Sequence, residues 1–229
     1  MNDKSNSLSS DNKPTCRMYL IRHGETANAG QVCFNGHFDV DLSERGKNQS
    51  RRLADALKDL PIRAVYCSDL KRTLLGARYI GDHHGLTPVP CPELRELSFG
   101  TWEGLSVDEV NRKYPDQLHK RLKNIETFHV EGGESFPQLR ARAIPKFEEI
   151  VSEHPEDCIA ILCHGGVIRT FLAHVLGIPL KNMFRIHQPY AAVNIIQFYE
   201  GGDPVVELTG GSCDNIHPPN PLDKEMFIQ

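Results

Sequence analysis

The sequence predicts an α/β protein built as a three-layer α/β/α sandwich around a mainly parallel sheet. Short apolar runs of strand length alternate along the chain with longer segments of helical periodicity. One run, Cys158 to Cys163, is apolar throughout, which is typical of a strand buried on both faces of a parallel sheet. The length of 229 residues suits one compact α/β unit. We therefore expect a single domain over residues 16–229, preceded by a flexible polar tail over residues 1–15.

In the first half of the chain, two strands are each followed by a helix. Apolar runs of four or five residues that stop at polar residues predict the strands. The first helix has apolar residues at helical spacing, with Ser43 as its N-cap and Pro61 at its end. The expected elements are a strand over residues 17–21, a helix over 43–60, a strand over 64–67 and a helix over 69–80.

In the second half, the same alternation continues around the apolar run described above. Periodic apolar residues predict a long helix with a bend near Pro145, and a Gly201-Gly202 turn separates two late strands. The expected elements are a helix over residues 135–151, a central strand over 158–163, a helix over 167–176 and strands over 192–199 and 205–208.

Charge, hydropathy and cysteine spacing exclude several classes of protein. A formal net charge of -4 argues against sequence-independent binding of nucleic acid, which needs a basic surface. No apolar run is long enough for a transmembrane helix and the first residues lack the apolar core of a secretory signal, so we expect a cytoplasmic protein without membrane contact. The seven cysteines lack CxxC or finger spacing and HExxH is absent, which predicts reduced thiols and no metal site.

The first chemical signal is Arg22-His23-Gly24, directly after the first strand. A guanidinium beside an imidazole, followed by a glycine that permits close backbone approach, suits an anionic substrate. Taken alone, the motif fits a hydrogen-bonded strand-end histidine equally well.

The second signal, His164-Gly165-Gly166, lies between the central strand and a helix. The free N–H groups and the positive end of that helix would face a bound phosphate. In a parallel sheet, ligands bind beyond the carboxyl ends of the strands, where both histidine-glycine pairs fall. We therefore expect the two pairs to meet at one crevice.

Two further segments supply candidate side chains. Arg72 lies in the first turn of a helix that follows the second strand, although a solvated surface charge is the common alternative for a single arginine. The irregular segment from Glu93 to Gly104 carries three carboxylates and the only tryptophan, and loops of this kind often supply a general acid.

The ordered motifs RHGET, SDLKRT, ELSFGTWEG and HGGVIR, between Arg17 and Tyr199, resemble the histidine phosphatase superfamily, which includes the cofactor-dependent phosphoglycerate mutases. The resemblance implies a phosphoglycerate mutase-like fold, a phosphohistidine intermediate on His23, and no metal or other cofactor. It further implies a phosphate pocket of Arg22, Arg72 and His164, a proton donor at Glu96, and substrate contacts from Thr26, Asn28, Gly36 and Gly165.

The stretch between Glu96 and His164 is short, as in the phosphatase branch that includes alpha-ribazole phosphatase-like enzymes. We therefore expect a phosphomonoesterase that acts on a small phosphorylated metabolite. Two alternatives stay open: phosphoglycerate mutase-type phosphoryl transfer, and a non-catalytic protein that only binds a phosphorylated ligand. A homodimer also stays open.

Overall fold

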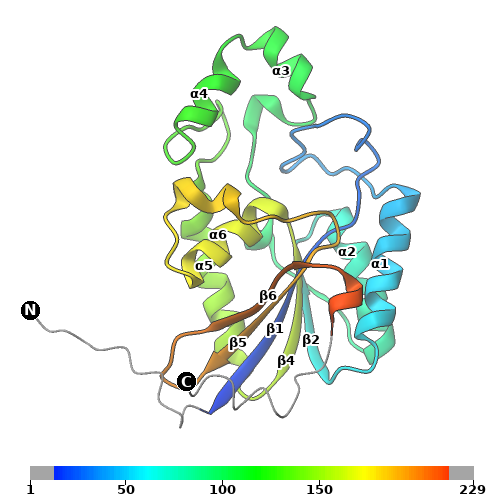
Figure 1. The fold of residues 1–229 in the computed structure, drawn as a ribbon. Coiled ribbons are helices and arrows are strands. Elements are labelled where there is room, and N and C mark those ends of the chain that lie inside the picture. The colour runs from blue at the N-terminus through cyan, green and yellow to red at the C-terminus, as the bar shows by residue number, and fades with distance from the viewer. Residues whose placement is uncertain (1–12, 217–229) are drawn as a thin grey trace, which may run out of the picture.

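The computed structural model describes residues 13–216, which form a six-stranded sheet between two layers of helices (Figure 1). The strands are β1 (Pro14–Arg22), β2 (Ile62–Cys67), β3 (Val89–Pro90), β4 (Cys158–Cys163), β5 (Val193–Tyr199) and β6 (Val205–Gly211). Their order across the sheet is β3-β2-β4-β1-β5-β6. β1 to β4 pair in parallel, whereas β5 is antiparallel to both of its neighbours. The predicted three-layer sandwich with a mainly parallel sheet is confirmed.

Helices cover both faces of the sheet because successive residues of its strands are apolar on both sides. Figure 1 shows α1 (Glu44–Leu57) and α2 (Lys71–His84) on one face, and α5 (Phe136–Glu153) and α6 (Gly165–Val175) on the other. The short 3-10 helices are Pro92–Leu94, Gly100–Trp102, Leu180–Arg185 and Cys213–Asn215. Every residue of β4 is buried, as expected for the central strand. None of the described helices is long and apolar enough to cross a membrane.

Several boundaries differ from the expected ones. β1 begins at Pro14 rather than residue 17, because Pro14 pairs with Tyr199 of β5. Of the expected tail, residues 1–12 lie outside the described residues. α5 continues through Pro145 as one helix, capped by the hydroxyl of Ser135. α6 begins at Gly165, two residues before the expected start.

The most visible departure from the expected elements is an excursion of the chain over residues 100–133. It contains α3 (Val107–Lys113) and α4 (Gln117–Lys123), which lie beyond the strand ends (Figure 1) and were not predicted. Backbone hydrogen bonds of 3.0 and 2.9 Å join its two ends. Glycine is required at this neck: Gly100 has a φ of 48°, and a Cβ there would lie 2.1 Å from the carbonyl oxygen of Glu131.

Candidate active site

The two histidine-glycine motifs meet at one end of the sheet. Arg22 of β1 and Cys163 of β4 are partners in the parallel register, so the next residue of each strand, His23 and His164, lies beside the other. Their ring centroids are 5.2 Å apart, and the two residues are 6% and 0% exposed. The structure therefore brings together the strand ends that the sequence predicts to converge.

The tautomer of His23 follows from a single hydrogen bond. Its Nδ1 lies 2.7 Å from the carbonyl oxygen of Gly24, and since a carbonyl can only accept, Nδ1 carries the proton. Nε2 therefore holds the lone pair. Burial, together with the charges of Arg72 and Arg22, lowers the pKa of His23 well below 6.5. The ring is neutral at pH 7, which is the form of an imidazole that can act as a nucleophile.

His164 has the opposite tautomer. Nε of Arg72 donates to its Nδ1 at 3.3 Å, which places the proton of the neutral ring on Nε2. This Nε2 is buried and has no hydrogen-bond partner among the described residues. Burial and the charge of Arg72 lower the pKa of His164 well below 6.5. Because a buried donor normally has an acceptor, an unpaired one beside His23 is suited to an anionic ligand.

Arg72 lies inside the protein rather than on its surface. It is 1% exposed, so the alternative of a solvated surface charge is wrong. Its Nη2 donates to the carbonyl oxygen of Gly36 at 2.6 Å and its Nη1 to that of Phe38 at 3.0 Å. Arg72 thus ties the loop after β1 to His164.

Arg22 is held by the loop that precedes β5. Its Nη1 donates to the carbonyl oxygen of Gln188 at 2.5 Å, and its guanidinium lies 4.4 Å from the ring centre of Tyr190. Ala191, which has an unusual φ of 57°, donates its N–H to the carbonyl oxygen of His23 at 3.0 Å. Nε of Arg22 is buried and without a partner among the described residues, so it is a second donor for an anion.

The carboxylate of Glu96 is anchored to the start of α6. Its Oε2 accepts the N–H of Gly166 and its Oε1 accepts that of Leu97, both at 2.9 Å. A Cβ on Gly166 would lie 2.3 Å from Oε1, so a larger residue here would push the carboxylate aside. Each oxygen keeps a second lone pair that these two N–H groups do not use.

A cavity of about 230 Å³ opens at this end of the sheet. Its lining is formed by Arg22, His23, Thr26, Cys33, Phe34, Asn35, Gly36, Arg72, Glu96, Phe99 and Tyr190. His164 is fully buried beside the ring of His23. The five side chains predicted to be catalytic therefore lie together around one small space.

Of the four residues predicted to contact the substrate, two line the cavity and two do not. Thr26 and Gly36 line the cavity. Asn28 instead exchanges two amide hydrogen bonds, of 2.7 and 3.0 Å, with Asn35, which is the residue that lines the cavity. Gly165 is buried below Arg22, where a Cβ would lie 3.2 Å from Nε.

Sequence reasoning missed several residues of the wall. Phe99 belongs to a motif that was recognised, and its apolar character beside a glycine could have marked it as a lining residue. Phe34, Asn35 and Tyr190 reach the cavity from irregular segments, where no periodicity or motif distinguishes them.

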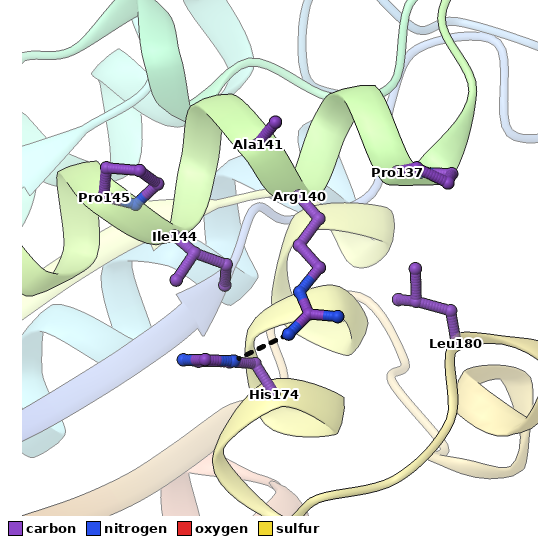
Figure 2. A pocket seen from close by; sticks show the side chains of 7 residues that line it. All are labelled: Pro137, Arg140, Ala141, Ile144, Pro145, His174 and Leu180. Atoms are coloured by element: carbon purple, nitrogen blue, oxygen red, sulfur yellow. Dashed lines mark hydrogen bonds between the residues drawn. The ribbon is translucent and has the colours of Figure 1, made fainter.

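A larger cavity of about 470 Å³ lies between α5, the end of α6 and the segment that follows α6 (Figure 2). Within its lining, Nη2 of Arg140 lies 3.2 Å from Nδ1 of His174 (Figure 2). The lining consists of Pro137, Arg140, Ala141, Ile144, Pro145, His174 and Leu180, which include none of the predicted site residues. Among residues 13–216, no group of three histidine, cysteine or acidic side chains is arranged to hold a metal ion.

A buried neutral histidine with one free nitrogen, set among guanidinium groups, is an arrangement suited to the transfer of phosphoryl groups. The chain belongs to the histidine phosphatase superfamily (branch 1), whose family model matches residues 18–210. It is 28% identical over 192 residues to phosphoserine phosphatase 1 of Hydrogenobacter thermophilus, covering 84% of this chain and 91% of the relative. It is 29% identical over 194 residues to the adenosylcobalamin/alpha-ribazole phosphatase of Escherichia coli, covering 79% of this chain and 91% of the relative.

The fold also matches that of a phosphatase of known structure. The structure of a mycobacterial glucosyl-3-phosphoglycerate phosphatase matches with a TM-score of 0.78 and 26% identity, covering 87% of this chain and all of that one. The family, the phosphoglycerate mutase-like fold and the phosphatase class of enzyme that the motifs predict are thereby confirmed.

Proposed function

We propose that the chain hydrolyses phosphomonoesters of small metabolites in two steps, with Nε2 of His23 as the nucleophile. The observation that carries this proposal is the 2.7 Å hydrogen bond from Nδ1 of His23 to the carbonyl oxygen of Gly24. It fixes the ring so that the nitrogen with the lone pair is the one without a backbone partner. The lowered pKa keeps that lone pair free of a proton at neutral pH.

In the first step, Nε2 of His23 bonds to phosphorus as the bond from phosphorus to the ester oxygen breaks. The buried donors that lack partners, Nε of Arg22 and Nε2 of His164, bind phosphoryl oxygens, and the charge of Arg72 stabilises the same group. Glu96 gives its proton to the departing oxygen, which leaves as an alcohol.

In the second step, the carboxylate of Glu96 takes a proton from a water molecule. The water oxygen bonds to phosphorus and the phosphorus–nitrogen bond breaks. Inorganic phosphate leaves and His23 returns to its neutral form. The same carboxylate therefore serves as acid and then as base, which its two anchoring N–H bonds permit because they leave a lone pair on each oxygen.

Relatives that carry phosphatase names support hydrolysis, and relatives named as probable phosphoglycerate mutases keep phosphoryl transfer between metabolites as the second candidate. The free thiols of all seven cysteines support the cytoplasm as the proposed location, since disulfides form in oxidising compartments. Release of inorganic phosphate, measured beside mutase turnover of phosphoglycerates with and without bisphosphoglycerate, tests the choice. Mutase turnover faster than phosphate release would contradict it.

Trapping the intermediate tests the nucleophile. Quenching during turnover of a labelled substrate is expected to leave acid-labile, base-stable phosphate on His23, and label on serine or aspartate would refute the assignment. His23→Ala is expected to abolish turnover with an unchanged circular dichroism spectrum. The matched control is His174→Ala, which changes a partly exposed histidine at the end of α6 and is expected to keep full activity.

A further inference from the structure

Arg121, on α4, is a buried cation without an adjacent counter-ion. It is 8% exposed, and within the described part of the chain its guanidinium has neither a hydrogen bond nor a carboxylate within salt-bridge distance. Its contacts are aromatic: the guanidinium carbon lies 5.2 Å from the ring centre of Phe99 and 5.6 Å from that of Phe136. A largely buried charge is stabilised by pairing, and the nitrogens of Arg121, which are not among the fully buried atoms without a partner, keep the access that an anion needs.

The position of Arg121 connects it to the catalytic cavity. Phe99, whose ring it contacts, lines that cavity, and so does Glu96, whose charge acts on the guanidinium. Burial lowers the pKa of Arg121 to about 10, which the charge of Glu96 opposes. The guanidinium therefore stays protonated at neutral pH.

A second guanidinium lies near the same group of aromatic rings, and like Arg121 it is not part of the cavity lining. Arg169 of α6 lies 5.5 Å from the ring centre of Phe184, and the charge of Glu96 acts on it too. The ring of Phe184 packs edge-on against Phe136 at 5.7 Å, which links it to the aromatic contacts of Arg121. Arg169 differs in that its Nε and Nη1 donate to backbone carbonyl oxygens at 2.9 and 3.1 Å. Of these two arginines, Arg121 is therefore the one without a polar partner among the described residues.

The proposed role of Glu96 determines which part of a substrate would lie nearest to Arg121. Glu96 must contact the ester oxygen that departs, so the leaving group lies on the side of Glu96 rather than on the side of His23. The leaving group is then the part of the substrate nearest to Arg121. An anionic substituent on it would supply the missing counter-charge, whereas a neutral one would leave the cation buried and unpaired.

We propose that Arg121 determines specificity by pairing with a carboxylate or a second phosphate on the leaving group. The substrates of this chain are then small phosphomonoesters that carry a further anionic group. This inference rests on the proposed phosphatase function, and it assigns a role to α4 that the transfer chemistry itself does not need.

The test compares two substrates that differ by one carboxylate, phosphoserine and phosphoethanolamine. The wild type is expected to favour phosphoserine in kcat/KM. Arg121→Met, which keeps the length and apolar contacts of the side chain, is expected to lower kcat/KM for phosphoserine by roughly 30-fold or more and to change that for phosphoethanolamine by less than about 3-fold. Arg121→Lys is expected to retain part of the preference. The control Arg112→Met removes an exposed charge from α3 and is expected to alter neither value.

Three outcomes would overturn the inference: no preference of the wild type for phosphoserine, equal losses on both substrates in Arg121→Met, or unchanged kinetics in that variant. Equal losses would mean that Arg121 only holds the aromatic rings around it in place and does not pair with the substrate. If Arg121→Met does not fold, the wild-type preference and the Arg121→Lys values decide the matter. Hydrolysis of p-nitrophenyl phosphate by the wild type is measured in parallel. Its absence would count against the proposed function, whereas its presence without a preference would count against this inference alone.

Discussion

Gly166→Ala is expected to lower activity without weakening the fold. The added Cβ would lie 2.3 Å from Oε1 of Glu96, whereas close carbon–oxygen contacts in proteins are about 3.3 Å, so the carboxylate must move by about 1 Å. A misplacement of that size costs roughly 100-fold in rate, or about 2.7 kcal/mol of transition-state stabilisation. Alanine meanwhile favours helix α6 by up to about 1 kcal/mol relative to glycine.

The assay separates loss of the acid from general damage. kcat/KM reports steps only up to departure of the leaving group, so attack by water does not enter. The leaving group of phosphoethanolamine is an alkoxide that needs a proton, so kcat/KM for this substrate is expected to fall roughly 100-fold. p-Nitrophenyl phosphate, whose leaving group is stable as an anion, is expected to lose only a few-fold. The control is Gly30→Ala, where a Cβ meets nothing within 4 Å. Equal losses on both substrates, or wild-type rates, would refute the role of Glu96.

Acidification from about pH 7.5 to 5.5 is expected to destabilise the fold. Burial holds the pKa values of His23 and His164 well below 6.5 in the folded protein, whereas in the unfolded chain both histidines bind protons near pH 6.5. Below pH 6.5 the free energy of unfolding falls by up to about 1.4 kcal/mol per histidine and pH unit. Urea titrations at several pH values measure this slope, and a His164→Asn variant with an unreduced slope would contradict the argument. Glu103→Ala removes the acceptor of three backbone N–H groups and is expected to cost about 2 to 3 kcal/mol in urea unfolding, whereas the exposed control Glu131→Ala costs almost nothing. Asn28→Ala releases the cavity-lining amide that it holds and is expected to raise KM about five- to tenfold in steady-state kinetics, with kcat unchanged; a fall in kcat alone would argue against a role in substrate binding.

The central part of the site could be predicted because it depends on a short-range pattern. An apolar run fixes where a strand ends, and parallel pairing brings strand ends to the same edge of a sheet. The register of Arg22 with Cys163 then places the residues that follow them side by side. The position of His23 beside His164 therefore needs no knowledge of loops.

The rest of the wall could not be predicted because it depends on long-range packing. Tyr190 reaches Arg22 through a loop whose φ of 57° at Ala191 is carried by an ordinary alanine, so nothing in the sequence marks the turn. α3 and α4 have seven residues each, too few for a clear helical period. The burial of Arg121 on α4 could not be predicted either, because a basic residue on a short helix usually faces solvent.

Because the two ends of the excursion over residues 100–133 meet at Gly100, the excursion can be exchanged as one unit. Since the two ends of the excursion are already hydrogen-bonded to each other, the body of the protein would encounter the same anchor points whatever peptide is joined between them. The groups proposed for phosphoryl transfer all lie outside this span, and Arg121 lies within it. Transplanting the span from one family member to another would then exchange the choice of alcohol while the phosphorus chemistry is inherited from the recipient.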